Sequence, residues 1–408
     1  MIFIYRISLV FYRFVARILS LFDDKAKKFV QGRKGLLGII AEDKIAVQRP
    51  LWFHCSSLGE FEQARPLIDG FSESGEKILL TFFSPSGFEH RKDYKNADWV
   101  YYLPMDSPKN AKNFIKLTRP KAAIFVKYDL WYFYLKNLAE SKIPKYLISA
   151  IYQKDQIYFK SVLGRLHRSM LRMFDHIYLQ NNESQNLLKN IDILNTSVVG
   201  DTRVDSVLHR ARNVENLPLV EQFLEGKKAI ILGSAYLEEV KMLHAIRKEL
   251  KDEKIIIAPH DISEKNINTL KTVLAPKSLL HSQINDLQKI KCNVLIIDNI
   301  GTLFNCYQYG KWAFIGGGFG KGLHNTLEPA AFSLPMCFGP KYQKFAEAVV
   351  MIQHGTAKAI EQPSDLKALY LSLQNESVRR TLAEKIKSFL QESKGASEKI
   401  QNEISLQI

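Results

Sequence analysis

The fold is indicated by residues 51–83, which read LWFHCSSLGEFEQARPLIDGFSESGEKILLTFF. The runs 51–55 and 78–83 are almost continuously apolar, and a tight turn and a helical stretch separate them. Strands of this character, each followed by a helix, are typical of a parallel sheet that is covered on both faces. This stretch therefore predicts an α/β fold.

The same alternation continues through the chain and is passed through twice. Candidate strands of the first series are 51–55, 78–83, 100–103, 122–126, 146–149, 177–180 and 197–199. Those of the second series are 229–232, 255–258, 294–297, 312–315 and 336–338. A polar, charged stretch at 200–218 separates the two series, so we expect two doubly wound domains. Ligands of such folds bind beyond the carboxyl ends of the strands, and with two facing domains the crevice is expected between them.

Composition limits the class of protein. The chain has 408 residues, more than one hydrophobic core usually serves, which also favours two domains. Hydrophobic residues make up 46% and charged residues 24%, which excludes a largely disordered chain. The net charge of +15 favours nucleic acid, acidic lipid headgroups or phosphorylated substrates as partners. The four cysteines have neither CxxC nor zinc-site spacing, so we expect free thiols in a reducing cytosol and no metal site.

The N-terminal segment 1–22, MIFIYRISLVFYRFVARILSLF, is apolar but carries three arginines. It has neither the uninterrupted apolar run nor the cleavage site of a signal peptide. At about 100° per residue, Arg6, Arg13 and Arg17 share one narrow arc of a helix, and apolar residues fill the other faces. This pattern predicts a basic amphipathic helix in a membrane interface. The alternatives are a helix packed on its own protein and a tilted span with snorkelling arginines.

Five turns at expected strand ends carry candidate site residues, and two of them lie in the first series of strands. In HCSSLGE at 54–60, Glu60 opens a helix, where the helix dipole stabilises a carboxylate and allows a general base; the alternative is a simple helix-start carboxylate. In FSPSG at 83–87, small hydroxyl residues and a glycine suit a polar ligand, although they are also ordinary turn formers.

The strongest signal is GGGFGKGLHNTLEP at 316–329, where a strand runs into five glycines before a helix that starts near Thr326. Backbone amides of such a turn, with Lys321, could hold a phosphate, and Glu328 could accept hydrogen bonds from ribose hydroxyls. The alternative is a structural glycine turn. The turns GSAY at 233–236 and APHD at 258–261 lie on the same sheet edge, where each alone is an ordinary turn.

Taken in order, these segments resemble the 3-deoxy-D-manno-octulosonic acid (Kdo) transferases of lipid A assembly. The resemblance spans roughly residues 50–350 and is carried by HCSSLGE at 54–60, SPSG at 84–87, YLPMDSP at 102–108, DLW at 129–131, GDTRVD at 200–205, GS at 233–234, HNTLEPAA at 324–331, FGP at 338–340 and KFAE at 344–347.

The resemblance implies a GT-B fold and metal-independent, inverting transfer of Kdo from CMP-Kdo to a lipid A precursor (lipid IVA), with Glu60 as the base. No cofactor is implied, and the expected location is the cytoplasmic face of the inner membrane. The implied ranges are a membrane-interface helix at 1–22, an acceptor domain at 23–205, a nucleotide domain at 206–380 and a helical segment at 381–408. The implied donor-binding residues are Ser234, His260, Gly317, Gly318, Gly320, Lys321, Asn325 and Glu328. The implied acceptor-side residues are Ser57, Gly59, Ser84, Ser86, Gly87 and Asp129.

Four positions depart from the family pattern. Lys127 and Tyr132 replace an acidic residue and a proline around the Leu-Trp pair, and His260 replaces an arginine that could hold the CMP phosphate. Leu323 replaces a glycine before His324-Asn325. These departures put in doubt any acidic role at Lys127 and the cation that binds the donor phosphate.

Two other functions fit parts of the pattern. One is a different enzyme of the same fold, a heptosyltransferase or a sugar-nucleotide epimerase, but the SLGE motif argues against it. The other is a non-catalytic basic protein that binds membranes or nucleic acid. Because the aromatic residues are scattered through strands and are not interleaved with Lys and Arg, we expect no nucleic-acid partner.

Overall fold

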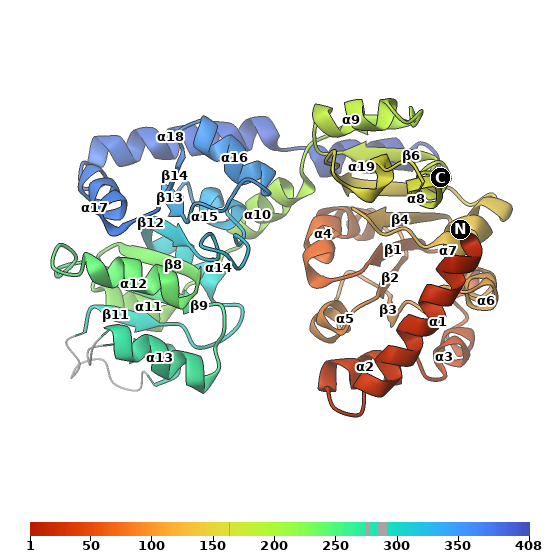
Figure 1. Cartoon of the computed structure of the whole chain (residues 1–408), viewed down its shortest axis with the longest axis horizontal. Helices are drawn as coiled ribbons and strands as arrows, with labels where there is room; N and C mark the ends of the chain where they lie inside the picture. Colours follow the sequence, from red (N-terminus) through yellow and green to blue (C-terminus); the bar gives the residue numbers. More distant parts are fainter. Residues whose placement is uncertain (163, 275–277, 284–291) are drawn as a thin grey trace. The chain divides into compact units, whose positions relative to one another are not determined.

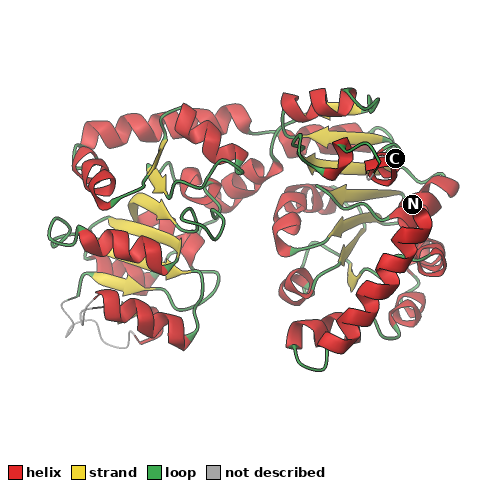
Figure 2. Ribbon diagram, viewed as in Figure 1, coloured by secondary structure: helices red, strands yellow, loops and turns green. Residues whose placement is uncertain are grey.

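The computed structural model describes residues 1–162, 164–274, 278–283 and 292–408. Over these residues the chain forms two units, each built around a seven-stranded parallel sheet with helices (Figures 1 and 2). Unit 1 comprises Met1–Ser206 and Ser393–Ile408, and unit 2 comprises Val207–Glu392. The predicted α/β class with two parallel sheets is confirmed.

The sheet of unit 1 has the order β3-β2-β1-β4-β5-β6-β7. Its strands are β1 (Leu51–Cys55), β2 (Ile78–Phe82), β3 (Trp99–Tyr102), β4 (Ala122–Val126), β5 (Lys145–Ala150), β6 (His176–Leu179) and β7 (Thr196–Val198). Its helices are α1 (Ile2–Leu19), α2 (Asp24–Gln31), α3 (Leu36–Glu42), α4 (Leu58–Glu73), α5 (Pro85–Arg91), α6 (Pro108–Thr118), α7 (Tyr132–Glu140), α8 (Gly164–Leu171), α9 (Asn182–Lys189) and α19 (Ala396–Ser405), with short 3-10 turns at Ile45–Val47 and Ile157–Phe159.

The continuous apolar runs are explained by two cores, one on each face of this sheet. Along β1, Phe53 and Cys55 pack with α4 and α19, whereas Trp52 packs with residues of α6 and α7. All five residues of β1 are buried, so no position of the strand could be polar without a partner inside the protein. His54 satisfies this condition through Thr81, whose hydroxyl lies 2.9 Å from its Nδ1.

The sheet of unit 2 has the order β10-β11-β9-β8-β12-β13-β14. Its strands are β8 (Ala229–Ala235), β9 (Lys254–Pro259), β10 (Ser278–Leu280), β11 (Val294–Ile296), β12 (Gly310–Ile315), β13 (Met336–Phe338) and β14 (Ala357–Ala359). Its helices are α11 (Pro218–Leu224), α12 (Leu237–Ala245), α13 (Glu264–Leu274), α14 (Leu303–Cys306), α15 (Leu327–Ala331), α16 (Ala346–Gln353), α17 (Pro363–Ser372) and α18 (Glu376–Ser393), with 3-10 turns at His281–Gln283 and Tyr307–Tyr309.

The strands β10 and β14 were not predicted. Both have three residues and lie at the edges of the sheet, and the AKA sequence of β14 has none of the β-branched or aromatic residues that mark a strand. Pairing with a neighbouring strand, not local sequence, makes these segments extended.

The boundary between the units falls inside α10 (Thr202–Arg212), one residue from the expected 205/206 division. The stretch predicted as a break is therefore partly helical. The expected C-terminal segment 381–408 does not stay together, because residues from Ser393 onward belong to unit 1. Ile400 and Ile404 of α19 are fully buried in the core beside β1 and α4.

Asp205 fixes this returning segment. Its carboxylate accepts hydrogen bonds from the amides of Gly395 (2.7 Å) and Ser397 (2.8 Å) at the start of α19. Replacing a carboxylate that caps a helix start costs about 1–2 kcal/mol, so we expect Asp205→Ala to lower the free energy of unfolding by that amount. Chemical denaturation would measure it, with the exposed Asp93→Ala as control. Equal stability of the two variants would contradict this role.

The N-terminal helix α1 packs on unit 1 through one face only. Tyr5 donates a hydrogen bond to Asp106 (2.6 Å), and Ala16 is buried beside Phe29. The opposite face is apolar and exposed, as at Phe3 (71%), Val10 (70%) and Phe11 (66%). Within the described ranges, no helix combines the length and apolar character needed to cross a bilayer.

Candidate functional site

Glu60 lies at the carboxyl end of β1, in the first turn of α4. The helix starts at Leu58, two residues before the predicted start, and Ser57 is its N-cap residue. The hydroxyl of Ser57 donates a hydrogen bond of 2.8 Å to Glu60 Oε2. Burial raises the pKa of Glu60. The hydrogen bonds from Ser57 and, to a smaller extent, the charge of Lys127 favour the ionised form and so limit this rise. The carboxylate is thus held in place and more basic than an ordinary glutamate.

Asp129, expected on the acceptor side, lies beneath the same turn and is only 5% exposed. Its carboxylate accepts the amide of Ser56 at 3.0 Å and also the hydroxyl of Ser56. Burial and then the neighbouring charge of Glu60 hold its pKa well above the usual range. The side chain of His54 lies 3.8 Å away, with a pKa lowered to about 3 by burial, so it is neutral. In this structure Asp129 supports the turn that carries Glu60.

Lys127 lies at the same sheet edge, directly after β4, with a left-handed backbone (φ 55°). Its positive charge lowers the pKa of Glu60 and also that of Asp201, which follows β7. Burial raises the pKa of Asp201, but Arg203 and then Lys127 bring it below the usual value. Arg203 pairs with the Asp201 carboxylate at 2.6 Å. Lys127 therefore acts on the electrostatics of Glu60, a role that its place in the sequence alone did not reveal.

The serine turn after β2 adjoins the Glu60 turn. The amide of Ser84 donates to the carbonyl of Ser56 (2.8 Å), and the hydroxyls of Ser84 and Ser86 are 2.6 Å apart. Packing explains the glycine at position 87, because a Cβ there would collide with the ring of Phe82. Gly59, by contrast, is exposed, and a Cβ there would make only an ordinary contact of 3.9 Å with the hydroxyl of Ser57. The structure thus brings the predicted acceptor-side residues to one edge, while two of them, Asp129 and Gly87, are accounted for by support and packing.

In unit 2, the glycine turn follows β12 as predicted, and α15 begins at Leu327, next to the expected Thr326. Gly317 (φ 89°) and Gly322 (φ 103°) have left-handed backbones that favour glycine. Gly318 lies against a second turn, because a Cβ there would come within 2.5 Å of the amide nitrogen of Gly339. Left-handed backbone angles and the close approach of two backbones therefore account for three of the five glycines of the turn.

Glu239 is a residue of this site that sequence reasoning missed. It is 1% exposed, and its two carboxylate oxygens accept the amides of Gly317 (2.8 Å) and Tyr236 (2.9 Å). In this structure the Gly317 amide is therefore taken up by Glu239, and a donor-binding role for Gly317 stays a prediction. The spacing of Tyr236 and Glu239 at the start of α12 is that of a capping box, which could have indicated the residue.

Three rings gather beside the glycine turn. The ring centroids of His260 and His324 are 4.6 Å apart, and those of Tyr236 and His260 are 4.9 Å apart. His324 Nε2 lies 3.3 Å from the hydroxyl of Tyr236. Burial, and then the proximity of His260, lower the pKa of His324 to about 4, so this imidazole is neutral. The three rings form an aromatic wall in which the ring planes are tilted against one another by 23–32°.

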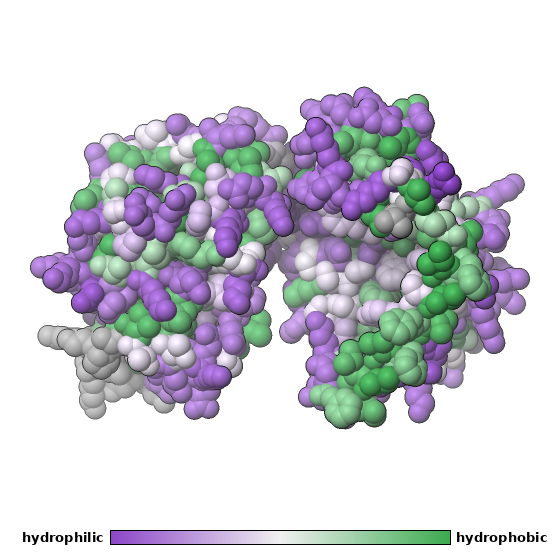
Figure 3. Space-filling model, in the orientation of Figure 1, coloured by the Kyte–Doolittle hydropathy of each residue, from purple (hydrophilic) through white to green (hydrophobic). Residues whose placement is uncertain are grey.

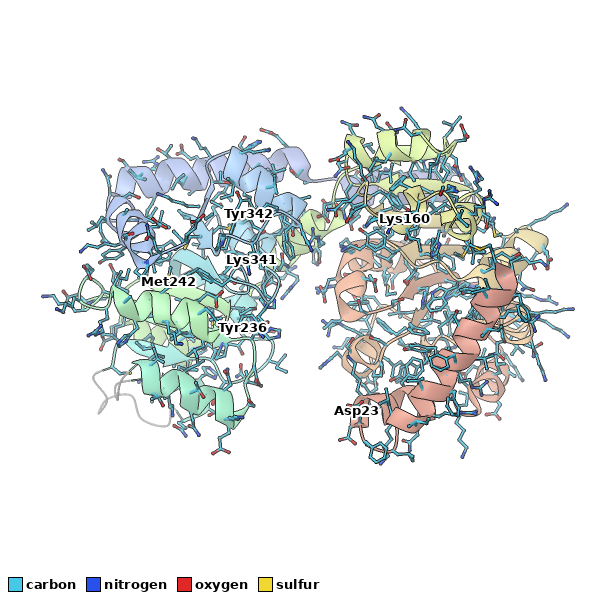
Figure 4. The ribbon with its side chains drawn as sticks, viewed as in Figure 1. Asp23, Lys160, Tyr236, Met242, Lys341 and Tyr342 are labelled. Atoms are coloured by element: carbon cyan, nitrogen blue, oxygen red, sulfur yellow. The ribbon has the colours of Figure 1, made fainter. Side chains whose placement is uncertain are left out.

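A cavity of about 210 Å³ next to this wall is lined by Tyr236, Glu238, Glu239, Gly317, Phe319, Gly320 and Lys321. A second lysine approaches from the turn after β13: Lys341 Nζ is 3.5 Å from the position that a Cβ on Gly320 would take. Tyr236 and Lys341 are labelled in Figure 4. Two lysines, Lys321 within the glycine turn and Lys341 next to it, thus bring positive charge to this cavity.

Two of the remaining predicted donor residues, Glu328 and Asn325, have partners inside unit 2. Glu328 pairs with Arg210 (3.3 Å), whose guanidinium lies 3.7 Å from the ring centroid of Phe304. The side chain of Asn325 accepts the amide of Leu327 (3.0 Å) and so caps the start of α15. Ser234 has a left-handed backbone (φ 50°) at the end of β8. Contact of any of these with a nucleotide stays a prediction. Among the described residues, no group of His, Cys, Asp and Glu could hold a metal ion.

Comparison with known proteins supports the assignment of these motifs. Residues 28–206 match the family model of 3-deoxy-D-manno-octulosonic-acid transferase (kdotransferase). The transferase of that name from Aquifex aeolicus is 28% identical over 72% of this chain and 77% of its own length. The one from Haemophilus influenzae is 23% identical over 94% of this chain and 92% of its own length.

Among solved structures, the UDP-GlcNAc 2-epimerase of Neisseria meningitidis has the same fold, with a TM-score of 0.63 over 88% of this chain and 100% of its own, at 13% identity. That likeness concerns architecture alone. The ordered motifs, the matched segment that carries Glu60 and the two relatives agree with one another. Residues 28–206 therefore carry a domain of the 3-deoxy-D-manno-octulosonic acid (Kdo) transferase family, and the chain is similar to transferases of that name over 72% and 94% of its length.

Proposed function

We propose that the chain is an inverting glycosyltransferase that moves Kdo from CMP-Kdo to a lipid A precursor, without a metal, in the lipopolysaccharide pathway. The observation that carries this proposal is the setting of Glu60. Its carboxylate is half-buried at the carboxyl end of β1, hydrogen-bonded to Ser57, and near the charge of Lys127. This is the environment of a general base, because burial raises its proton affinity while the helix start and Lys127 favour the ionised state.

The proposed step needs one base. Glu60 takes the proton of an acceptor hydroxyl as the acceptor oxygen bonds to the anomeric carbon of Kdo. The bond from that carbon to the CMP phosphate breaks, and its electron pair leaves with CMP. Attack from the face opposite to the leaving group inverts the anomeric centre, so no covalent intermediate on the protein is required.

On the donor side, the proposal assigns the CMP phosphate to the glycine turn and its two lysines, Lys321 and Lys341. The carboxylate of Glu239 holds the Gly317 amide and thereby the shape of the turn. The wall of Tyr236, His260 and His324 offers aromatic ring faces on which a cytosine ring could stack.

The proposal is tested by transfer in detergent with EDTA present. The purified protein would receive CMP-Kdo, generated in place, and a tetra-acylated lipid A precursor, and the lipid would be followed by mass. A gain of one or more Kdo units is expected. No gain from a protein with a normal unfolding transition would overturn the proposal, and UDP and ADP sugars would then be tested for a heptosyltransferase or epimerase.

Lys127→Met is expected to shift the acid limb of the pH–rate profile to higher pH. Transfer needs ionised Glu60, so the rate falls as the pH drops through the pKa of Glu60. Because Lys127 lowers that pKa, removing its charge raises it, and the fall begins at a higher pH. The profile of kcat/KM measures this, with Lys127→Arg as a control that keeps the charge. Superimposable limbs for the Met variant and the wild type would contradict the assignment.

The proposal extends to location: α1 lies in the interface of the inner membrane, on its cytoplasmic face. The support is a helix with one face packed on unit 1 and the opposite face apolar and exposed. A phosphorylated lipid acceptor would be presented in the same interface. The alternative, a helix packed on its own protein, accounts for the inner face of α1. It does not explain why the outer face is apolar and exposed.

Phe11→Ser combined with Phe14→Ser is expected to weaken vesicle binding by about tenfold or more, since each removes a ring that is 66% or 58% exposed on α1. Folding should be unaffected, because neither ring is buried. Vesicle co-sedimentation would measure the change. The matched control is Val47→Ser with Leu194→Ser, which removes exposed apolar side chains (80% and 72%) away from α1. Equal losses for both doubles would remove the support for α1 as the membrane contact.

A further inference from the structure

Unit 1 contains a cavity of about 820 Å³ that the proposed chemistry does not use. It lies between the second half of α1, the helix α2 and the start of α3. Its charged lining residues are Arg13, Arg17, Lys27, Arg33 and Lys34, and none of the residues that line it is acidic. Five cations around one cavity without a carboxylate form a strong site for an anion.

Arg33 fixes the inner wall of this cavity. Its guanidinium donates to the carbonyls of Phe29 (2.9 Å), Phe83 (2.6 Å) and Leu103 (2.8 Å), and it lies 3.9 Å from the ring centroid of Phe29. These bonds orient the group without neutralising it, because carbonyls carry no net charge. Burial lowers the pKa of Arg33 to about 10, so it remains a cation at neutral pH. An anion in the cavity would supply the missing countercharge.

The outer cations are not committed to acidic partners within the described part of the chain. No ion pair is formed there by Arg13, Arg17, Lys27 or Lys34, whereas the neighbouring Lys28 pairs with Glu89 (3.6 Å). The arginine row of α1 is thereby divided: Arg13 and Arg17 line the cavity, and Arg6 does not.

The cavity also has apolar walls that continue onto the outer surface. Ala16, Phe29, Leu36 and Met105 line it. Leu21 both lines it and is 75% exposed, next to Phe22 at 84%. Figure 3 shows apolar side chains following the outer face of α1. A ligand that fits this combination has a phosphate for the cations and hydrocarbon chains for the face of α1.

We propose that this cavity binds the phosphate headgroup of an anionic membrane phospholipid, with its acyl chains along α1. The inference rests on the membrane-interface part of the proposed function and adds a discrete, saturable lipid site to it. Guanidinium and ammonium groups form strong, charge-assisted hydrogen bonds with phosphate, which a diffuse charged surface does not arrange around one ligand.

The site is tested by calorimetry. Short-chain phosphatidylglycerol is titrated into the full chain below its micelle concentration, and the heat of binding is measured. Saturable binding of one lipid per chain is expected. Arg13→Gln with Arg17→Gln should weaken it by at least about tenfold. The matched control, Arg6→Gln with Lys25→Gln, removes two charges from the same surface outside the cavity and should leave it unchanged. Absent binding, or equal loss in both doubles, would overturn the site.

Binding to vesicles distinguishes the lipid site in the cavity from general electrostatic attraction to an anionic surface. On phosphatidylcholine vesicles that contain phosphatidylglycerol, the control double should lose only the diffuse term, about fivefold per charge. The cavity double should lose at least about tenfold more. Competition by the lipid A precursor at these residues, with no binding of phosphatidylglycerol, would assign the cavity to the acceptor and overturn the proposal.

Transfer in phospholipid-free detergent should be the same for both doubles, so a failure of the lipid site is distinguishable from a failure of the glycosyltransferase proposal.

Discussion

Glu60→Gln is expected to lower the rate of Kdo transfer by about 10²–10⁴-fold, the usual contribution of a positioned general base. Glutamine keeps the size of the side chain and can still accept the hydrogen bond from Ser57, but it cannot take the acceptor proton. The measurement is kcat with saturating donor and acceptor, because the loss should appear in the chemical step and not in the binding of either substrate.

Stability should not fall in this variant. The pKa of Glu60 is raised in the folded protein, so the folded state binds the proton more tightly than the unfolded state. Its favourable contribution is present at low pH and is lost as the pH rises through the folded pKa. At neutral pH the ionised, half-buried group therefore costs stability, and a neutral glutamine removes that cost. We expect an equal or higher Tm.

Glu62→Gln is the matched control, since Glu62 lies on the same helix and pairs with Arg65 (3.3 Å) and Arg91 (2.9 Å) away from the proposed chemistry. It should transfer Kdo at a rate near that of the wild type. A Glu60→Gln enzyme with nearly normal kcat would show that another group removes the proton, and the base assignment would then be withdrawn.

Gly318→Ala is expected to destabilise unit 2 by about 3 kcal/mol or more, at the top of the range for overpacking. The added Cβ would lie 2.5 Å from the amide nitrogen and 2.8 Å from the Cα of Gly339, and backbone atoms cannot move aside as the end of a flexible side chain can. Because Lys341 follows that second turn and its amide donates to the carbonyl of Gly318 (2.8 Å), the displacement should also weaken binding of CMP.

The matched control is Gly355→Ala in the same unit. Gly355 has a left-handed backbone (φ 65°) but open space around it, so alanine there meets only the conformational cost, about 1–2 kcal/mol. The free energy of unfolding of both variants is measured with denaturant, and CMP binding is measured by calorimetry. The comparison distinguishes the effect of steric overlap at Gly318 from that of backbone strain alone at Gly355. If Gly318→Ala were no less stable than Gly355→Ala and bound CMP normally, the close contact of the two turns would not be essential.

Much of the architecture could be read from sequence because its causes are local. The strand β1 and the helix α4 follow from an apolar run and a turn that are adjacent in the chain, and they place Glu60 at the sheet edge wherever the rest of the chain goes. The glycine turn at 316–322 was predicted for the same reason. The edge strands β10 and β14 were not, because their extended form depends on a neighbour that is distant in sequence.

The candidate site divides in the same way. The sequence placed Glu60, the serine turns and the glycine turn, and the resemblance gave them roles. It did not show that Glu239 occupies the Gly317 amide, 78 positions away, or that Asp129 supports Ser56 across 73 positions. Nor did it show that Lys127, taken only as a departure from the family pattern, lowers the pKa of Glu60.

The sequence by itself therefore determined the strand–helix alternation, the two sheets and the residues at the ends of the strands, since periodicity and turn chemistry act over a few neighbouring residues. Only the tertiary structure decided which of those residues face one another, that α19 returns to unit 1, and that Arg13 and Arg17 line a cavity with Arg33 while Arg6 does not. The physical reason is that charge, burial and hydrogen bonding act through space: a pKa or a binding cavity is set by neighbours that chain order alone does not specify.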